Sequence, residues 1–272
     1  MTGQPYASPV PPGTGWPDDP AAPDTPVART PDDVRRLAAS AALDELTAEV
    51  SVCRACPRLV TWREDVAEGR RASFAHEPYW GRPIAGWGDP DPRVLVLGLA
   101  PAAHGGNRTG RIFTGDRSGD WLFASLHRVG LAAQQTSVHA GDGQRLLDAR
   151  MVATVRCAPP DNKPTIEERD TCAPWLVREL TLVAPSVRAV VCLGSYAWDA
   201  ALRTFRLAGY AVPRPKPRFG HGAEAVISGD DRDLVLLGSY HPSQQNTFTG
   251  KLTEPMLDAV LGRAAALAAV AG

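Results

Sequence analysis

The sequence predicts an α/β fold in which a mostly parallel sheet carries helices on both faces. Apolar runs of strand length, with the composition of strands buried on both faces, occupy residues 93–98, 150–156, 187–194 and 233–239. Helical patterns alternate with these runs, at residues 118–130, 165–183, 195–206 and 253–271. Strands that alternate with helices favour parallel pairing, with right-handed crossovers that cover both faces of the sheet.

The N-terminal part of the chain has a different composition. Residues 1–30 hold eight prolines and almost no apolar pattern, which predicts a disordered tail ahead of one domain at residues 31–272. A helix is expected to start at Thr30-Pro31, because proline suits the first helical position. Its apolar stripe would consist of Val34, Leu37, Ala38, Ala41, Leu43 and Leu46.

The helix expected at residues 165–183 has a clear start signal. Thr165 is a suitable N-cap, and Glu167 and Glu168 place negative charge in the first turn. Three strand ends are followed by unusually polar loops: the first loop (residues 99–116), the second loop (157–163) and the third loop (240–249). Because ligands of such sheets bind beyond the carboxyl ends of the strands, we expect the three loops to form one crevice.

Composition excludes several function classes. The chain has 272 residues, 44% of them apolar, and a net charge of −1, so no overall basic field indicates nucleic acid. No apolar run reaches the roughly 18 residues of a membrane span, and the start of the sequence lacks the features of a signal peptide. We therefore expect a cytoplasmic protein, in which five cysteines indicate metal binding or chemistry rather than disulfides.

Four of the cysteines form a candidate metal site. Cys53 and Cys56 have C-x2-C spacing, Cys157 follows a strand, and Cys172 lies in a helical run. Zinc and iron–sulfur clusters both accept four thiolates, and this spacing does not choose between them. The alternative is a chance set of free thiols. Cys192, inside an apolar strand, is interpreted as a small buried hydrophobic residue.

The first loop is rich in glycine but matches neither of the common phosphate-binding glycine patterns. Phe113 lies in a segment too polar for a core, so its ring is a candidate for stacking on a planar ligand. Asp116 is either an acidic catalytic group or only the N-cap of the next helix. Arg108 and Arg111 would supply positive charge.

The second and third loops add polar groups. Asn162, on a loop stiffened by prolines, can offer a donor and an acceptor that match the O4 and N3–H edge of uracil; the alternative is a turn asparagine. His241 precedes a proline and is held extended at a strand end, pointing into the crevice or merely lying on the surface. The donors that follow suit phosphate and base contacts: Ser243, Gln244, Gln245 and Asn246.

Taken together, "GLAPAAHGGNRTGRIFTGD" (98–116), "CAPPDNKP" (157–164) and "HPSQQNTFTGKLT" (241–253) resemble the motifs of the uracil-DNA glycosylase superfamily, closest to its family 5, b-type enzymes. The resemblance runs from Cys53 to Leu252. It implies a three-layer α/β/α sandwich with a short, mostly parallel sheet. It also implies a four-iron, four-sulfur (4Fe-4S) cluster on Cys53, Cys56, Cys157 and Cys172.

The resemblance also implies a role for each candidate residue. Phe113 would stack on a base flipped out of DNA, Asn162 would read its edge, and the segment formed by Gly98, Ala100 and Pro101 would border it. Asp116 and His241 would be catalytic. Arg108 and the donors at residues 243–246 would contact DNA. Leu99 and Ala100 stand where other branches have a polar or acidic residue, which leaves the acidic role to Asp116.

The implied activity is monofunctional cleavage of the N-glycosidic bond of uracil in DNA, leaving an abasic site. Hypoxanthine and other deaminated bases are expected as further substrates, and the enzyme is expected to act as a monomer on the nucleoid. Two other interpretations stay open at this point. One is a non-catalytic iron–sulfur protein that binds nucleic acid. The other is a nucleotide-binding α/β enzyme, although the lysine expected for phosphates is absent from the loop.

Overall fold

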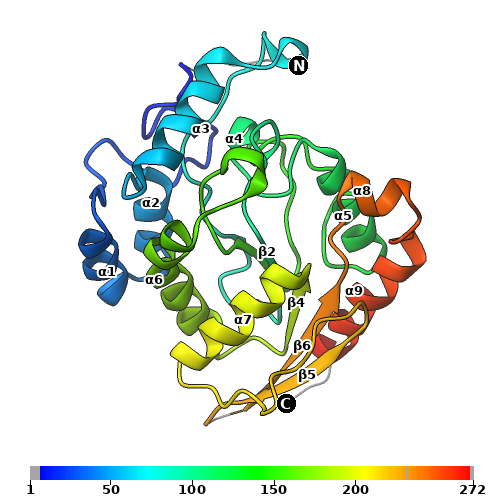
Figure 1. The fold of residues 1–272 in the computed structure, drawn as a ribbon. Coiled ribbons are helices and arrows are strands. Elements are labelled where there is room, and N and C mark those ends of the chain that lie inside the picture. The colour runs from blue at the N-terminus through cyan, green and yellow to red at the C-terminus, as the bar shows by residue number, and fades with distance from the viewer. Residues whose placement is uncertain (1–6, 231, 270–272) are drawn as a thin grey trace.

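The computed structural model describes residues 7–230 and 232–269, and it is a three-layer α/β/α sandwich (Figure 1). Its six-stranded sheet has the order β1-β3-β2-β4-β6-β5. The strands are β1 (Trp87–Gly88), β2 (Val94–Gly98), β3 (Ala149–Ala153), β4 (Ala189–Leu193), β5 (Glu224–Ser228) and β6 (Asp233–Ser239). The four central strands are parallel, as the sequence predicts.

Both edge strands pair antiparallel with their neighbours and were not predicted. β1 has only two residues, too few for a periodic signal. β5 alternates between exposed and buried residues, since only one of its faces is covered. The four central strands were recognisable because all or nearly all of their residues are buried on both faces.

Helices cover the two faces of the sheet. Val94 and Val96 point to the layer formed by α5 (Arg117–Arg128) and α9 (Glu254–Ala269). Leu95 and Leu97 point to the opposite layer, formed by α6 (Ile166–Val183) and α7 (Ser195–Leu207). This alternation along one strand is the physical basis of the three layers. The last two residues of the C-terminal helix expected at 253–271 lie outside the described part of the chain.

The N-terminal helical region is more divided than the sequence indicated. The predicted helix is two helices, α1 (Pro31–Ser40) and α2 (Leu43–Val52), because Ala41 and Ala42 adopt extended backbone between them. Thr30 caps α1 as expected. Further short elements follow outside the sheet: α3 (Pro57–Gly69), η1 (Ala72–Phe74), α4 (Gly106–Thr109), η2 (Pro160–Asn162) and α8 (Gln244–Phe248).

Residues 7–30 are not the disordered tail that their composition suggested. They lie against the domain, with Val10, Ala21 and Ala28 buried. Asp19 forms a two-pronged ion pair with Arg82, with N–O distances of 2.8 and 3.0 Å, and both side chains are buried. A composition argument misses such a segment because its partners lie far away in the sequence. Residues 1–6 lie outside the described part of the chain.

We expect Asp19→Asn to lower the free energy of unfolding by about 3 kcal/mol, because it leaves the buried Arg82 guanidinium without its counter-charge. Asp19 also accepts hydrogen bonds from three backbone N–H groups of its own segment, which an asparagine retains only in part. Urea denaturation measures the difference. Asp18→Asn, at an exposed neighbouring position, is the control. Equal stability of the two variants would show that the segment does not hold the domain.

Two smaller predictions concern single elements. Thr165 caps α6 and forms a capping box with Glu168, as expected. Cys192 is fully buried in the core between the sheet and α7, which fits its interpretation as a small hydrophobic residue.

Across residues 7–230 and 232–269, no helix has the length and hydrophobicity to cross a membrane.

Candidate active site

The three polar loops meet at one end of the sheet. In Figure 1, α4 lies in the upper middle of the view, and α5 and α8 lie at the right, where Arg117 at the start of α5 contacts Phe248 of α8. An open cavity of about 780 Å³ lies there, and its wall takes residues from each loop. From the three loops these are Ala102, Ala103, His104, Gly105, Gly115, Asp116, Pro159, Asp161, Asn162, Ser243 and Gln244. The crevice expected from the topology is therefore present.

Phe113 and His241 lie side by side beyond the ends of β2 and β6. Their ring centroids are 5.7 Å apart, with an angle of 38° between the rings. Phe113 has a φ of 51°, a region that side-chain-bearing residues rarely adopt, so the loop holds this ring against local strain. Gly98 provides the space beneath it, since a Cβ there would stand 2.7 Å from the ring. Neither ring lines the 780 Å³ cavity itself. The expectation that Phe113 lies outside a core is wrong, because its ring packs over Gly98 at the end of β2 and is buried in the core.

The surroundings of His241 keep its imidazole neutral. Loss of solvation lowers its pKa from the ordinary 6.5 to about 4. Its backbone carbonyl accepts a hydrogen bond of 2.8 Å from the side chain of Asn246, which ties α8 to the strand end. At neutral pH the ring is therefore an uncharged group that can donate one hydrogen bond and accept another.

This burial makes stability depend on pH. The unfolded chain binds a proton at His241 below about pH 6.5, whereas the folded chain does so only near pH 4. The contribution is therefore complete above pH 6.5 and is lost as the pH falls toward 4. We expect the wild type to lose about 2 kcal/mol more than His241→Gln between pH 7 and pH 5, measured by urea denaturation. Parallel losses in both proteins would contradict the buried neutral state.

Asp116 is both the N-cap of α5 and part of the cavity wall. Its Oδ1 accepts the Gly119 N–H at 2.9 Å. Its Oδ2 lies against Gly105, where a Cβ would come within 2.1 Å of that oxygen. Burial raises the pKa of Asp116, and the N–H groups at the start of α5 oppose this shift. Asp116 can therefore cap α5 with Oδ1 and still offer Oδ2 as an acidic group.

Asn162 lines the same cavity as Asp116, but from the second loop instead of the first. It is exposed and follows Asp161, and both residues have left-handed backbone, with φ of 55° and 53°. Two successive residues in this region are sustained only by a rigid loop. The second loop therefore presents a held amide to the crevice.

Arg108 is not placed to contact DNA as expected. Its side chain is 7% exposed, pairs with Glu77, stacks on the ring of Phe74 and donates to the Gly115 carbonyl at 2.7 Å. It fixes the shape of the first loop. A basic residue in a glycine-rich loop suggests an exposed charge, and only the contacts with residues 74 and 77 bury it.

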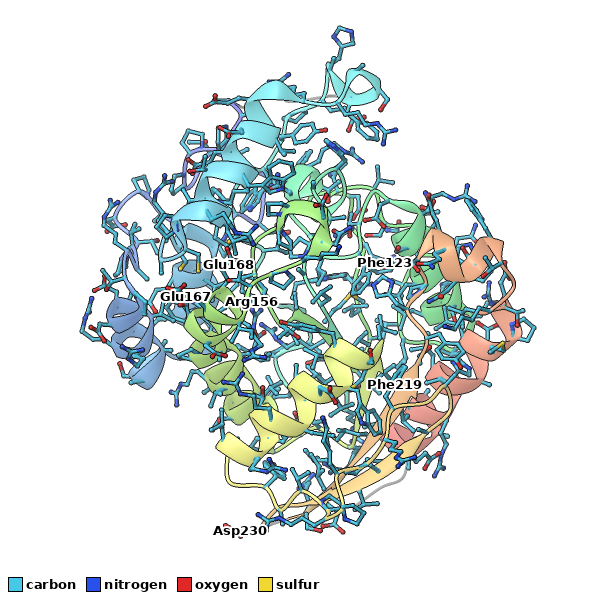
Figure 2. All side chains as sticks on the ribbon, in the orientation of Figure 1. Phe123, Arg156, Glu167, Glu168, Phe219 and Asp230 are labelled. Atoms are coloured by element: carbon cyan, nitrogen blue, oxygen red, sulfur yellow. The ribbon has the colours of Figure 1, made fainter. Side chains whose placement is uncertain are left out.

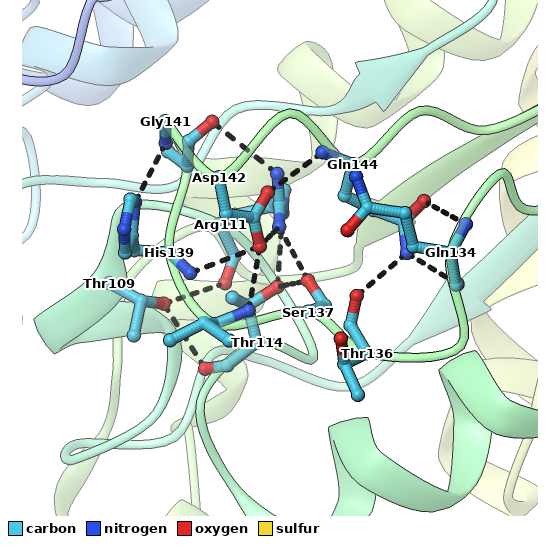
Figure 3. Close-up of polar contacts among 12 residues, drawn as sticks. Thr109, Arg111, Thr114, Gln134, Thr136, Ser137, His139, Gly141, Asp142 and Gln144 are labelled. Atoms are coloured by element: carbon cyan, nitrogen blue, oxygen red, sulfur yellow. Dashed lines mark hydrogen bonds and ion pairs between the residues drawn. The ribbon is translucent and has the colours of Figure 1, made fainter. Parts of the chain in front are cut away.

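Arg111 is also a buried part of the loop and supplies no free charge. It pairs with Asp142 at 2.7 Å and donates to Ser137 at 2.6 Å (Figure 3). Thr114 joins the same network through a hydrogen bond of 2.8 Å to Ser137. The segment around residues 137–142, which carries no obvious motif, therefore supports the first loop from behind.

The first-loop residues that line the cavity are not the ones that were predicted to border the base. Gly98 lies beneath the Phe113 ring, as described. Ala100 instead packs toward Leu59 and the cysteine region, and Pro101 packs against Gly106. The cavity is lined by residues 102–105 instead. The reason is that the chain turns away from the strand end before it reaches the crevice.

The donors of the third loop divide into two groups. Ser243 and Gln244 line the cavity, and Gln245 is exposed beside them. Asn246 is turned inward and donates one of its two side-chain N–H groups to the His241 carbonyl. These neighbours point in different directions because α8 starts at Gln244, and successive side chains of a helix are rotated around its axis.

Other cavity residues were missed by the sequence interpretation. Trp62, Arg71 and Arg117 line the wall with His104. Arg117 is exposed and lies 5.4 Å from the ring of Phe248, itself an exposed aromatic residue. Arg117 follows Asp116 directly and was open to recognition from the sequence. Trp62 and Arg71 carried no signal, since they belong to α3 and its C-terminal end.

The four candidate ligands come together at a second place. Cys53, Cys56, Cys157 and Cys172 line one small cavity between α2, α3, the end of β3 and α6. Burial and the neighbouring thiols raise the pKa of Cys56. Across residues 7–230 and 232–269, no three His, Cys, Asp or Glu side chains form a group ready to hold a metal ion.

Comparison with known proteins gives one consistent result. The family model of the uracil DNA glycosylase superfamily matches residues 85–264. A type-5 uracil-DNA glycosylase of Mycobacterium tuberculosis is 57% identical over 270 residues, covering 99% of this chain and 98% of the relative. The Thermus thermophilus protein of the same type is 50% identical over 80% of this chain and 95% of its own length. That of Pyrobaculum aerophilum is 44% identical over 82% and 92%.

Proposed function

The chain belongs to the uracil DNA glycosylase superfamily and is an enzyme that excises uracil from DNA, and we propose that the crevice formed by its three loops performs this reaction. The observation that carries the proposal is the arrangement of the loops. They set the Phe113 and His241 rings beside each other and place Asp116 and Asn162 on one adjoining cavity wall.

The first step is recognition of a flipped base. A uracil inside a duplex is out of reach, so the nucleotide must rotate into the crevice. Stacking on the Phe113 ring offsets roughly 1–3 kcal/mol of the flipping cost. The amide of Asn162 then pairs with the O4 and N3–H edge of the base. Arg117 and Arg71, on the cavity wall, are the cations placed to meet backbone phosphates.

Cleavage develops charge of opposite sign at two places. The sugar becomes positive in an oxocarbenium-like transition state, and the Asp116 carboxylate stabilises it and orients water. The departing base becomes negative, and the neutral imidazole of His241 donates a hydrogen bond to it. This scheme uses no lysine as a Schiff-base nucleophile, so the DNA strand is not cleaved. The products are the free base and an intact strand with an abasic site.

The same site supports excision of hypoxanthine. Hypoxanthine presents O6 beside N1–H, the same acceptor–donor pair that uracil presents with O4 and N3–H, so Asn162 meets equivalent atoms. The first loop lines the cavity of about 780 Å³ with small residues at positions 102, 103, 105 and 115, together with His104 and Asp116. A common hydrogen-bonding edge and the open cavity beside the Phe113 and His241 rings are the two supports of this wider range.

We further propose that the four cysteines hold a 4Fe-4S cluster. The supports are the shared cavity of the four thiols and the two buried arginines on its wall, Arg63 and Arg156. Such a cluster would cross-link α2, α3, β3 and α6, and its role here is structural. Cys157 also places it directly behind the second loop, which starts at this residue. The enzyme would act on DNA as a monomer, in the cytoplasm with the nucleoid.

Two measurements test these proposals separately. Labelled duplexes with one uracil or one hypoxanthine are incubated with the enzyme, and abasic sites are then cleaved with hot alkali. Cleavage that appears only after alkali supports monofunctional chemistry, and hypoxanthine left intact would limit the range to uracil. Iron and acid-labile sulfide in the anaerobically purified protein, near four of each per chain, would support the cluster. Zinc without sulfide would contradict it.

A further inference from the structure

Three buried side chains around the four cysteines carry hydrogen-bond donors without acceptors. Arg63, Arg156 and Trp175 are each 1% exposed and line the cysteine cavity. Within the described part of the chain, no acceptor stands at hydrogen-bonding geometry for Arg63 Nε, Arg156 Nε and Nη1, or Trp175 Nε1. Figure 2 labels Arg156 in this region, beside α6. Four unpaired donors on one cavity wall require a common explanation.

The donors that do have partners point to the same place. Arg63 Nη1 donates to the sulfur of Cys157 at 3.0 Å and to the Cys53 carbonyl at 3.0 Å. Trp175 and Arg156 line the same small cavity as Cys53 and Cys172. The three side chains therefore border the space that the four sulfur atoms share.

The buried charges around the cavity do not balance. Arg150 and Arg156 share one carboxylate, that of Glu179, at 2.7 and 2.6 Å, and all three side chains are at most 4% exposed. The nearest carboxylate to Arg63 is that of Glu64, 3.7 Å away and partly exposed. Burying an arginine without a compensating negative charge is unfavourable, so this wall calls for an anion. A cluster held by four thiolates is such an anion.

From these contacts, we infer that Arg63, Arg156 and Trp175 donate N–H hydrogen bonds to the sulfur atoms of the bound cluster, stabilise its negative charge and raise its reduction potential. The inference rests on the iron–sulfur cluster proposed above. Hydrogen bonds to sulfur and the charge around a cluster are known determinants of its potential. They favour the reduced form, because that form carries more negative charge. The three residues are thus positioning and tuning groups, not ligands.

The test uses two substitutions that remove donors in different ways. Trp175→Phe removes one N–H and keeps an aromatic ring, and Arg63→Lys keeps the charge but removes the planar fork. Trp198→Phe is the matched control, because that indole is equally buried but donates to the Pro217 carbonyl at 3.0 Å, in the core around α7. For each full-length protein, purified without oxygen, iron, sulfide, midpoint potential and the rate of cluster loss in air are measured.

We expect both cavity variants to keep their iron and sulfide, with the reduction equilibrium shifted about threefold toward the oxidised form. They should also lose the cluster absorbance in air several-fold faster than the Trp198→Phe control. Unchanged potentials and loss rates in loaded variants would overturn the inference and leave the cluster in place. A wild type without iron would overturn both the cluster and the inference, while uracil excision, measured separately, would stand.

Discussion

Asp116→Asn is expected to lower the single-turnover rate of uracil excision by about 100- to 1,000-fold while leaving the stability of the protein unchanged. Asparagine is as good an N-cap as aspartate, so the bond from Gly119 to the side chain survives. What disappears is the negative charge opposite the developing positive charge of the sugar. The substitution therefore separates the N-cap role that Asp116 has in the structure from the catalytic role proposed for it.

The pH dependence of the same reaction gives a second readout. Burial raises the pKa of Asp116 above the ordinary 3.8, and the carboxylate is the active form. The wild-type rate should therefore fall on the acid side with a midpoint above that value, and this limb should be missing in Asp116→Asn. Asp120→Asn, an exposed carboxylate on the same wall one turn along α5, is the control and should stay within about threefold of wild type. Equal rates in Asp116→Asn and wild type would reduce Asp116 to a helix cap.

His241→Ala is expected to lower the rate of bond cleavage by about 100-fold or more, because the departing base loses its hydrogen-bond donor. The pKa of about 4 keeps the imidazole neutral, so its contribution should not change between pH 6 and pH 8. His241→Gln retains an N–H donor of similar reach and should recover part of the rate. Single-turnover kinetics at saturating enzyme separate this effect from weaker DNA binding.

The control for this substitution is His127→Ala, since His127 is exposed near the end of α5. It should leave the rate unchanged. A His241→Ala variant with a normal cleavage rate and only weaker binding would show that His241 helps to seat the nucleotide and takes no part in charge stabilisation. A rate that rises below pH 6.5 in the wild type would contradict the neutral imidazole.

Much of the fold was predictable because the central strands are buried on both faces. Such strands must be continuous apolar runs, and runs of this kind are visible without a structure. The predicted runs lie within a few residues of β2, β3, β4 and β6. β1 and β5 could not be found in this way, because an edge strand is short or half exposed and resembles a loop.

The meeting of the three loops was predictable, but not every residue that lines the cavity between them. Asp116, Asn162 and Ser243 line the cavity, and Phe113 and His241 are neighbours beside it. Arg108 and Asn246 were expected at DNA and are turned inward instead. Trp62 on α3 and Arg71, just beyond the end of that helix, reach the cavity from a segment that no motif indicated.

The sequence by itself determined the order of the four central strands and of the helices that cover them, the polar loops at three strand ends and the family to which the chain belongs. These features depend on patterns among residues that are neighbours in the sequence, so they are visible without a structure. Only the tertiary structure decided that Asp19 seals the N-terminal segment against Arg82 and that Arg108 is used inside the first loop. It also brought unpaired donors of Arg63, Arg156 and Trp175 to the cysteines. Burial depends on contacts between residues far apart in the chain, and these exist only once the chain has folded.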